Sequence, residues 1–251
     1  MTMTQTPTLD KQTAAMYTVN KNVFFDAPSE KTSLPQRILR RLLARYEKPT
    51  TVKLVVTEQT VEYPLLFQQL ERTARTVLDF GCVEGVLPLQ LCALGYQVTG
   101  LDFRPYPFQH PNFTFCQADI FTWEPPENAF DAVVSISTVE HVGLGGYGDP
   151  TQNEGDKLAV QKLWRACRPG GKLYLSVPAG KPTTQQNLRV YDEQRLRALV
   201  PNLVSVRFFT KLERYGAWQE TNAQAIAGLV YTDYQATAPV QAVAFAIGEK
   251  Q

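Results

Sequence analysis

Hydrophobic and polar positions follow two periods along most of this chain. Short runs of β-branched and other apolar residues predict strands, because these residues favour the pleated, buried surface of a sheet. The runs are RTVLDF (75–80), QVTGLD (97–102), FTFCQADI (113–120), FDAVVSIS (130–137), GKLYLSVPAG (171–180), VSVRFFT (204–210) and VQAVAFAIGE (240–249). Apolar residues at helical spacing predict helices over residues 84–95, 154–168 and 191–200.

The order of these elements predicts an α/β fold. Near-continuous apolar strands that alternate with helices are typical of a mostly parallel sheet covered on both faces. We therefore expect a Rossmann-like, doubly wound sheet of seven strands, one for each run, with helices on both faces. Right-handed crossovers place the carboxyl ends of parallel strands, and with them the ligand crevice, along one edge of the sheet.

Cap and turn signals surround the helix predicted over residues 154–168. Thr151 and Glu154 have the spacing of a capping box at its start. RPGG (168–171) follows its end, and Pro169 and Gly170 suit the central positions of a type II turn.

The region before the first predicted strand has a different character. Residues 1–22 are polar and rich in Thr and Gln, which predicts poor order. SLPQRILRRLLARYEK (33–48) has an apolar helical face opposite four arginines, and such a helix packs on the main domain or on a partner subunit. The alternative is peripheral contact with acidic lipid or polymer. Residues 51–72 show no clear pattern, so we expect an N-terminal extension over 1–72 and one large domain over 73–251.

Composition narrows the class of protein. A hydrophobic fraction of 44% in 251 residues supports a proper core, and a net charge of +1 disfavours nucleic acid and anionic membranes as partners. The start MTMTQTPTLDKQ has no apolar signal core, and eighteen apolar residues never run together, which disfavours secretion and membrane spanning. Four cysteines without a C-x-x-C pair favour reduced thiols over disulfides or a metal site, as in a cytoplasmic protein.

Two glycine clusters compete as the cofactor loop. GLGGYG (143–148) has G-x-G-x-x-G spacing, but it begins six residues after its strand and opens no apolar helix. VLDFGCVEG (77–85) runs from a strand directly into a helix, where backbone N–H groups approach a ligand closely. The third glycine of a pyrophosphate loop is absent there, and Glu84 would bring negative charge towards a phosphate. A cofactor without phosphate, such as the cationic S-adenosylmethionine, therefore fits better.

The motif set resembles that of the class I S-adenosylmethionine-dependent methyltransferases over residues 75–180. The matching pieces, in family order, are VLDFGCVEG, VTGLDFRPY, FCQADIF, FDAVVSISTVEHVG and RPGGKLYLSVP. One departure is Val83, where the family usually has glycine, and it puts the cofactor affinity in question. More narrowly, STVEHVGLGGYGDP, HPNFTF and VPAG resemble a bacterial subgroup associated with sugar or surface-polysaccharide modification.

The resemblance implies that the cofactor lies across the ends of the first four strands. It places the methionyl part against Gly81 and Asp79, the ribose hydroxyls on Asp102, and the adenine amino group at Asp119. The alternative for each acid is a turn or helix-cap role, and Phe103 either packs on adenine or fills the core. The expected cofactor-binding residues are Asp79, Phe80, Gly81, Gly85, Asp102, Phe103, Asp119, Ile120 and Ser137.

His141 is the candidate catalytic residue, with Glu140 beside it. A hydroxyl acceptor is a poor nucleophile until its proton leaves, and histidine, with an ordinary pKa of about 6.5, suits that proton transfer. The alternative is a structural histidine. Glu140 would hold the imidazole or contact the cofactor's amine. GLGGYGDP then reads as a lid over the acceptor, with Tyr147 and Asp149 as substrate contacts, or as a plain connecting loop.

Together these features predict an S-adenosylmethionine-dependent O-methyltransferase acting on a small molecule or saccharide. The alternatives are a non-catalytic S-adenosylmethionine-binding or scaffold protein and, less favoured, an NAD-dependent oxidoreductase. Nucleic-acid methylation is disfavoured because the fourth strand ends in SIST rather than in an N-P-P-Y-like sequence. Tyr215, Trp218 and Tyr234 are candidates for an acceptor pocket or for ordinary core positions. The acceptor and the oligomeric state do not follow from the sequence.

Overall fold

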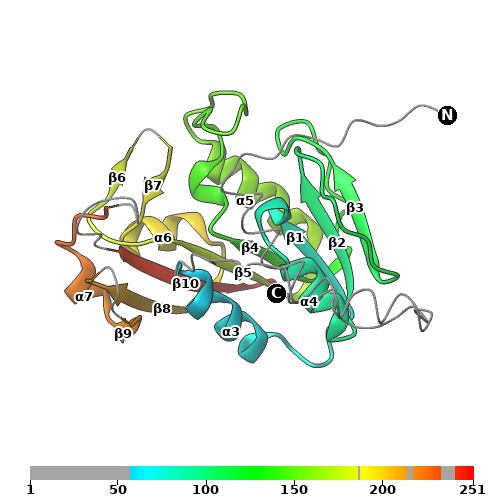
Figure 1. The fold of residues 1–251 in the computed structure, drawn as a ribbon, viewed down its shortest axis with the longest axis horizontal. Helices are drawn as coiled ribbons and strands as arrows, with labels where there is room; N and C mark the ends of the chain where they lie inside the picture. Colours follow the sequence, from blue (N-terminus) through cyan, green and yellow to red (C-terminus); the bar gives the residue numbers. More distant parts are fainter. Residues whose placement is uncertain (1–56, 186, 214–216, 233–240) are drawn as a thin grey trace, which may run out of the picture. The chain divides into compact units, whose positions relative to one another are not determined.

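The computed structural model describes residues 57–185, 187–213, 217–232 and 241–251, and these belong to one compact unit (Figure 1). The predicted polar N-terminus and the amphipathic helix over 33–48 lie outside the described residues. None of the described helices is long and apolar enough to span a membrane. The four cysteines are unpaired thiols, as the sequence predicted.

A mostly parallel sheet forms the centre of the unit, as predicted, and its strand order is β3-β2-β1-β4-β5-β10-β8-β9. The parallel strands are β1 (Thr76–Phe80), β2 (Gln97–Asp102), β3 (Phe113–Gln117), β4 (Phe130–Ile136) and β5 (Cys167–Pro178). Three antiparallel strands complete it: β10 (Gln241–Glu249), β8 (Leu203–Lys211) and β9 (Gln219–Thr221). The described sheet thus has eight strands rather than seven, because the short β9 was not predicted.

Alternate residues of the central strands enter two separate cores, one on each face of the sheet. One core holds Val133, Leu173 and Ala244 together with the apolar residues of α5 (Gly155–Ala166) and α6 (Glu193–Leu199). The other holds Val134, Tyr174 and Phe245 with those of α3 (Gln59–Gln69) and α4 (Leu87–Ala93). This alternation explains the continuous apolar runs, since both faces of each strand are buried.

Helix α3 is the main element that the sequence did not reveal. Its buried side chains are Glu62, Leu65 and Leu66, which share one face at helical spacing. A glutamate at a core position and Pro64 inside the helix hide the apolar period.

Several predicted boundaries were wrong by a few residues. The helix predicted from residue 84 begins at Leu87, because Cys82–Glu84 forms a 3-10 turn, η1. The third strand ends at Gln117 rather than at 120. No capping box forms at α5, since Glu154 makes no side-chain cap bond and pairs with Lys157 instead. Gly170 has a φ of 74°, as a type II turn requires.

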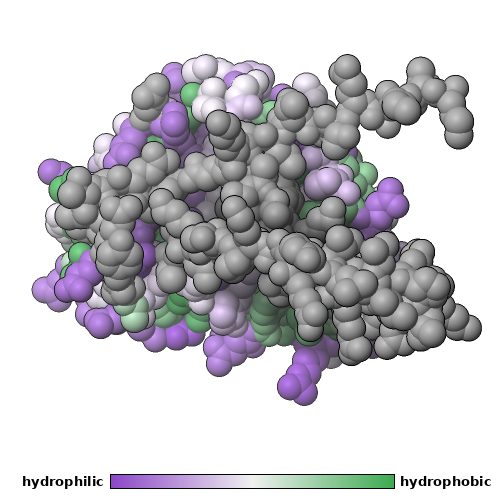
Figure 2. Space-filling model, viewed as in Figure 1, coloured by the Kyte–Doolittle hydropathy of each residue, from purple (hydrophilic) through white to green (hydrophobic). Residues whose placement is uncertain are grey.

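The edge of the sheet that β9 forms is polar. β9 is the last strand, and Gln219 and Glu220 on it are exposed. On the face shown in Figure 2, hydrophilic side chains gather at the side where Figure 1 places β9 and the short helix α7 (Ala223–Ile226). Charged and polar residues on an edge strand oppose pairing with another chain.

Candidate functional site

A cavity of about 410 Å³ lies at the carboxyl ends of β1, β2 and β4. The parallel register, which pairs β1 with β2 on one side and β4 on the other, brings these ends together. The thirteen residues predicted to bind the cofactor, to act in catalysis or to contact the substrate through the glycine-rich loop all line this one cavity: Asp79, Phe80, Gly81, Gly85, Asp102, Phe103, Asp119, Ile120, Ser137, Glu140, His141, Tyr147 and Asp149. Their individual roles remain predictions.

The glycine turn after β1 is sterically required. Gly81 has a φ of 80°, and a Cβ on it would lie 2.2 Å from the side chain of Thr138. A Cβ on Gly85 would lie 2.6 Å from the hydroxyl of Tyr63. Val83, which departs from the family pattern, turns its side chain into the core, while its N–H donates to the Asp102 carboxylate at 3.2 Å. With valine instead of glycine at this position, the backbone N–H of the turn still makes a hydrogen bond.

Asp102 is held in place by donors on both of its carboxylate oxygens. Besides Val83, the backbone N–H and the guanidinium of Arg104 donate to it, at 2.9 and 3.3 Å. The guanidinium also lies over the ring of Tyr147, 4.9 Å from its centre. Arg104 was not predicted as a site residue, because it follows the strand end by two residues without a motif of its own.

Asp79 is buried, and its Oδ2 has no hydrogen-bond partner among the described residues. Burial raises the pKa of this carboxyl, and the nearby Asp102 carboxylate raises it further. An unsatisfied acceptor of this kind favours a ligand that brings donors and positive charge.

Asp119 lies in the turn that follows β3. Its Oδ1 accepts from the N–H of Phe121 at 2.9 Å, and its carbonyl accepts from Trp123 at 2.8 Å. Ile120 beside it is buried. The carboxylate therefore has a turn role and also borders the cavity.

Ser137 follows β4 directly and is linked to α3 by a side-chain hydrogen bond. It has a φ of 45°, and its Oγ donates to Glu62 Oε1 at 2.7 Å. Burial raises the pKa of Glu62 to about 8, and the Glu58 carboxylate adds to this rise. Neither glutamate was selected from the sequence, because nothing there indicates that α3 lies over the end of β4.

His141 belongs to the 3-10 turn η2 (Val139–His141) and is positioned through its ring nitrogen Nδ1. Its Nδ1 contacts the backbone carbonyl of Asn187, and a carbonyl can only accept, so the proton lies on Nδ1. The other nitrogen, Nε2, lies 3.8 Å from Glu140 Oε1. The ring also meets Tyr147 edge-to-face, with 5.2 Å between the ring centres. Glu140 is buried, and burial raises its pKa well above the ordinary value.

The glycine-rich loop is tied by its own aspartate. Asp149 accepts from the N–H of Gly143 at 2.7 Å and from that of Tyr147 at 3.3 Å. Gly143, Gly145 and Gly148 all have positive φ, which explains the glycine spacing without a phosphate. Tyr147 is 41% exposed at the loop's tip.

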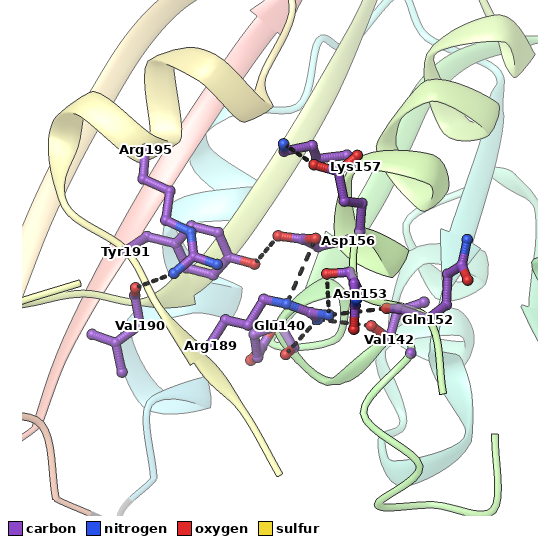
Figure 3. Close-up of polar contacts among 12 residues, drawn as sticks. Glu140, Val142, Gln152, Asn153, Asp156, Lys157, Arg189, Val190, Tyr191 and Arg195 are labelled. Carbon is purple, nitrogen blue, oxygen red and sulfur yellow. Dashed lines mark hydrogen bonds and ion pairs between the residues drawn. The ribbon is translucent and has the colours of Figure 1, made fainter. Parts of the chain in front are cut away.

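A buried arginine holds the stems of this loop (Figure 3). Arg189, on β7 (Arg189–Val190), donates to the carbonyls of Val142 at 2.7 Å and Glu140 at 3.3 Å, and also to those of Gln152 and Asn153 at 3.4 and 3.3 Å. The buried Asp156 balances its charge, with 3.6 Å between the ion-pair atoms. No sequence motif marked Arg189.

Trp218 also lines the cavity, and its indole N–H donates to the carbonyl of Thr57 at 3.2 Å. Tyr215 and Tyr234, the other aromatic candidates for an acceptor pocket, lie outside the described residues.

The fold is that of the class I S-adenosylmethionine-dependent methyltransferases. The 1,6-didemethyltoxoflavin N1-methyltransferase of Burkholderia thailandensis, solved with its substrate and S-adenosylhomocysteine, is similar with a TM-score of 0.53 and 14% identity, over 99% of this chain and 94% of that one. The phosphoethanolamine N-methyltransferase 2 of Haemonchus contortus is similar with a TM-score of 0.53 and 15% identity, over 79% of this chain and 55% of that one. The [4+2]-cyclase SpnF is similar with a TM-score of 0.51 and 13% identity, over 85% of this chain and 93% of that one. A protein named as a cyclase has this fold as well, so the fold alone does not define the reaction.

Curated relatives are similar over two thirds of the chain. The ubiquinone biosynthesis O-methyltransferase of Xanthomonas oryzae pv. oryzae is 27% identical over 180 residues, 66% of this chain and 71% of the relative. The enzyme of the same name from Pseudomonas putida is 24% identical over 178 residues, which are 65% of this chain and 72% of the relative. A family model described as a Caenorhabditis protein of unknown function, DUF268, matches residues 115–224.

Proposed function

We propose that this protein is an S-adenosylmethionine-dependent methyltransferase that methylates a hydroxyl group on a small molecule or saccharide. The observation that carries the proposal is the convergence of Asp79, Asp102 and Asp119, from the ends of three adjacent strands, on the cavity that also contains His141. The names of the curated relatives, which are O-methyltransferases, support transfer to oxygen.

The charges around the cavity fit a cationic cofactor. Its lining contains six carboxyl groups, and Arg104, which pairs with Asp102, is the one Lys or Arg among the described lining residues. The unpartnered Oδ2 of Asp79 suits an ammonium group, and Asp102 suits two ribose hydroxyls. A pyrophosphate would meet repulsion in the same place, which disfavours NAD.

His141 is suited to accept a proton from the acceptor. When bound, S-adenosylmethionine supplies a methyl group on a positively charged sulfur. The Asn187 carbonyl holds the Nδ1 proton of His141, so the neutral ring has its lone pair on Nε2. During transfer of that methyl group, Nε2 of His141 would accept the proton that the acceptor's hydroxyl group loses. Arg189 and Asn187 position the turn that carries this histidine.

Calorimetry tests the cofactor first. S-adenosylmethionine and S-adenosylhomocysteine should bind to the protein, and NAD should not. A mass-spectrometric screen of hydroxylated acceptors, sugars included, then tests the reaction. Binding of NAD alone would contradict the proposal. Cofactor binding without a methylated product throughout the screen would favour the non-catalytic alternative.

A further inference from the structure

Two buried carboxyl oxygens remain without a partner after the cofactor is accounted for. Glu140 Oε2 and Glu62 Oε2 are buried and make no hydrogen bond among the described residues. Glu140 is 1% exposed and is one of the residues that line the cavity, so its buried carboxyl group lies next to the space that a ligand would fill. Leaving a buried carboxylate unsatisfied is costly, which indicates a ligand that donates to it.

Glu140, Glu58 and the buried Glu62 form one acidic cluster, called the acidic wall below, of which Glu140 and Glu58 line the cavity and Glu62 does not. Glu140 comes from η2 and Glu62 from α3, while Glu58, one turn before Glu62, also lines the cavity. S-adenosylmethionine has a single ammonium group, and the orphaned Asp79 oxygen beside the Gly81 turn accounts for it. The described part of the chain has no group of three or more His, Cys, Asp or Glu placed to hold a metal ion.

We propose that Glu140, supported by Glu62 and Glu58, forms a subsite for a protonated amine on the methyl acceptor. This inference rests on the proposed methyltransferase function and names its substrate class. Glu140 Oε1 lies 3.8 Å from His141 Nε2, so the two side chains are close enough for one small acceptor to contact both.

The rest of the lining agrees with a positively charged acceptor. Tyr63, Trp218 and Tyr231 border the cavity, and aromatic faces attract an ammonium group. A phosphorylated or carboxylated acceptor would find no counter-charge in the acidic wall, and Arg104 is already engaged by Asp102. The residues that would bind an amine would therefore also disfavour a negatively charged acceptor.

Proton release should accompany binding of the amine. Burial raises the pKa of Glu140, and the carboxylates of Glu62 and Glu58 raise it further, against the opposing charge of Arg189. His141 also faces this carboxyl group, with Nε2 3.8 Å from Oε1. An ammonium group favours the ionised carboxylate, so its arrival should displace the proton of Glu140 into solvent.

Calorimetry on the full chain saturated with S-adenosylhomocysteine tests the subsite. The probes are glucosamine, glucose and glucuronate at about pH 6.5, where a sugar amine carries its proton. Glucosamine should bind at least about tenfold tighter than glucose, and glucuronate weakest. In buffers of different ionisation enthalpy, glucosamine alone should release a proton. The Glu140→Gln variant should lose both the preference and the proton release, with S-adenosylhomocysteine affinity within about twofold of the wild type.

Two further variants keep the test decisive. Glu62→Gln should weaken the amine preference even if Glu140→Gln folds poorly, and Glu124→Gln, an exposed position outside the cavity, should leave it unchanged. Failure of S-adenosylhomocysteine to bind would refute the proposed function itself. Cofactor binding without an amine preference, or without any glucosamine binding, would refute the subsite alone. A Glu140→Gln variant that loses cofactor affinity and keeps the preference would assign Glu140 to the cofactor's ammonium.

Discussion

Buried acids are the residues that distinguish this protein from an ordinary α/β domain. Asp79, Glu62 and Glu140 each keep one carboxyl oxygen without a partner among the described residues, and burial raises the pKa of all three. Such groups reduce the free energy of unfolding, so the presence of two of them, Asp79 and Glu140, along one cavity indicates a function that needs them. Asp79 followed from the motif after β1, whereas Glu62 did not, because it occupies a core position in an unrecognised helix.

The role of His141 can be tested by its removal. His141→Ala should reduce kcat by at least about 10²-fold, because the acceptor's proton then has no receiver. Affinity for S-adenosylhomocysteine, measured by calorimetry, should stay close to normal. The matched control is His110→Ala, which alters a loop histidine that only accepts from the Asn112 N–H. Near-full turnover of His141→Ala would remove this residue from the base role.

At the scale of elements, the strands were predictable and their connections were not. Apolar runs located β1, β2, β4, β5, β8 and β10 to within a few residues, because strands buried on both faces leave a strong local signal. α3 and β7 act through single buried polar residues, Glu62 and Arg189, and their partners are distant in the sequence. No local pattern could reveal such pairings.

Ionisation of Glu62 should loosen α3. The folded state keeps the proton of Glu62 up to about pH 8, whereas the unfolded chain releases it near 4.5. The carboxyl therefore lowers the stability of the folded protein increasingly as the pH rises between these values. The melting temperature of Glu62→Gln should exceed that of the wild type by an amount that grows over this window and is constant above it. Parallel melting curves across the window would contradict this.

Arg189 should control the order of the loop between Val142 and Asn153. Lysine keeps the charge but not the planar fork, so Arg189→Lys should lose at least one carbonyl bond on each stem. Proteolysis within residues 143–148 should then be about tenfold faster. The ring-nitrogen NMR signals of His141 should also shift, and those of His110 should not. Arg195→Lys, whose guanidinium contacts Tyr191 and not the loop, is the matched control. Unchanged proteolysis and unchanged His141 signals would contradict the assignment.

At the scale of the whole molecule, fold and site agree with each other. The parallel register and the strand order bring residues that are 62 positions apart in the sequence, Asp79 and His141, to one cavity. The resemblance to a known family predicted this convergence, because the ligand edge follows from the topology. The acceptor could not be predicted from the sequence, because α3, η2 and Trp218 come from distant parts of the chain and only the folded structure brings them to one cavity.

Ligand binding should stabilise the whole folded unit. S-adenosylhomocysteine at about one hundred times its Kd should raise the melting temperature by roughly 5–10 °C. Asp102→Asn should reduce this shift at the same ligand concentration, because the ribose hydroxyls lose a carboxylate partner. Differential scanning fluorimetry measures both. An equal shift in the variant would show that Asp102 does not bind the ligand.

The most direct test of the central claim is a crystal structure of the protein with S-adenosylhomocysteine. We expect the amino group at Asp79, the ribose on Asp102, the adenine beside Asp119 and the sulfur facing the side of the cavity that holds His141. A ligand bound elsewhere, or a structure in which the three aspartates point away from it, would contradict the account.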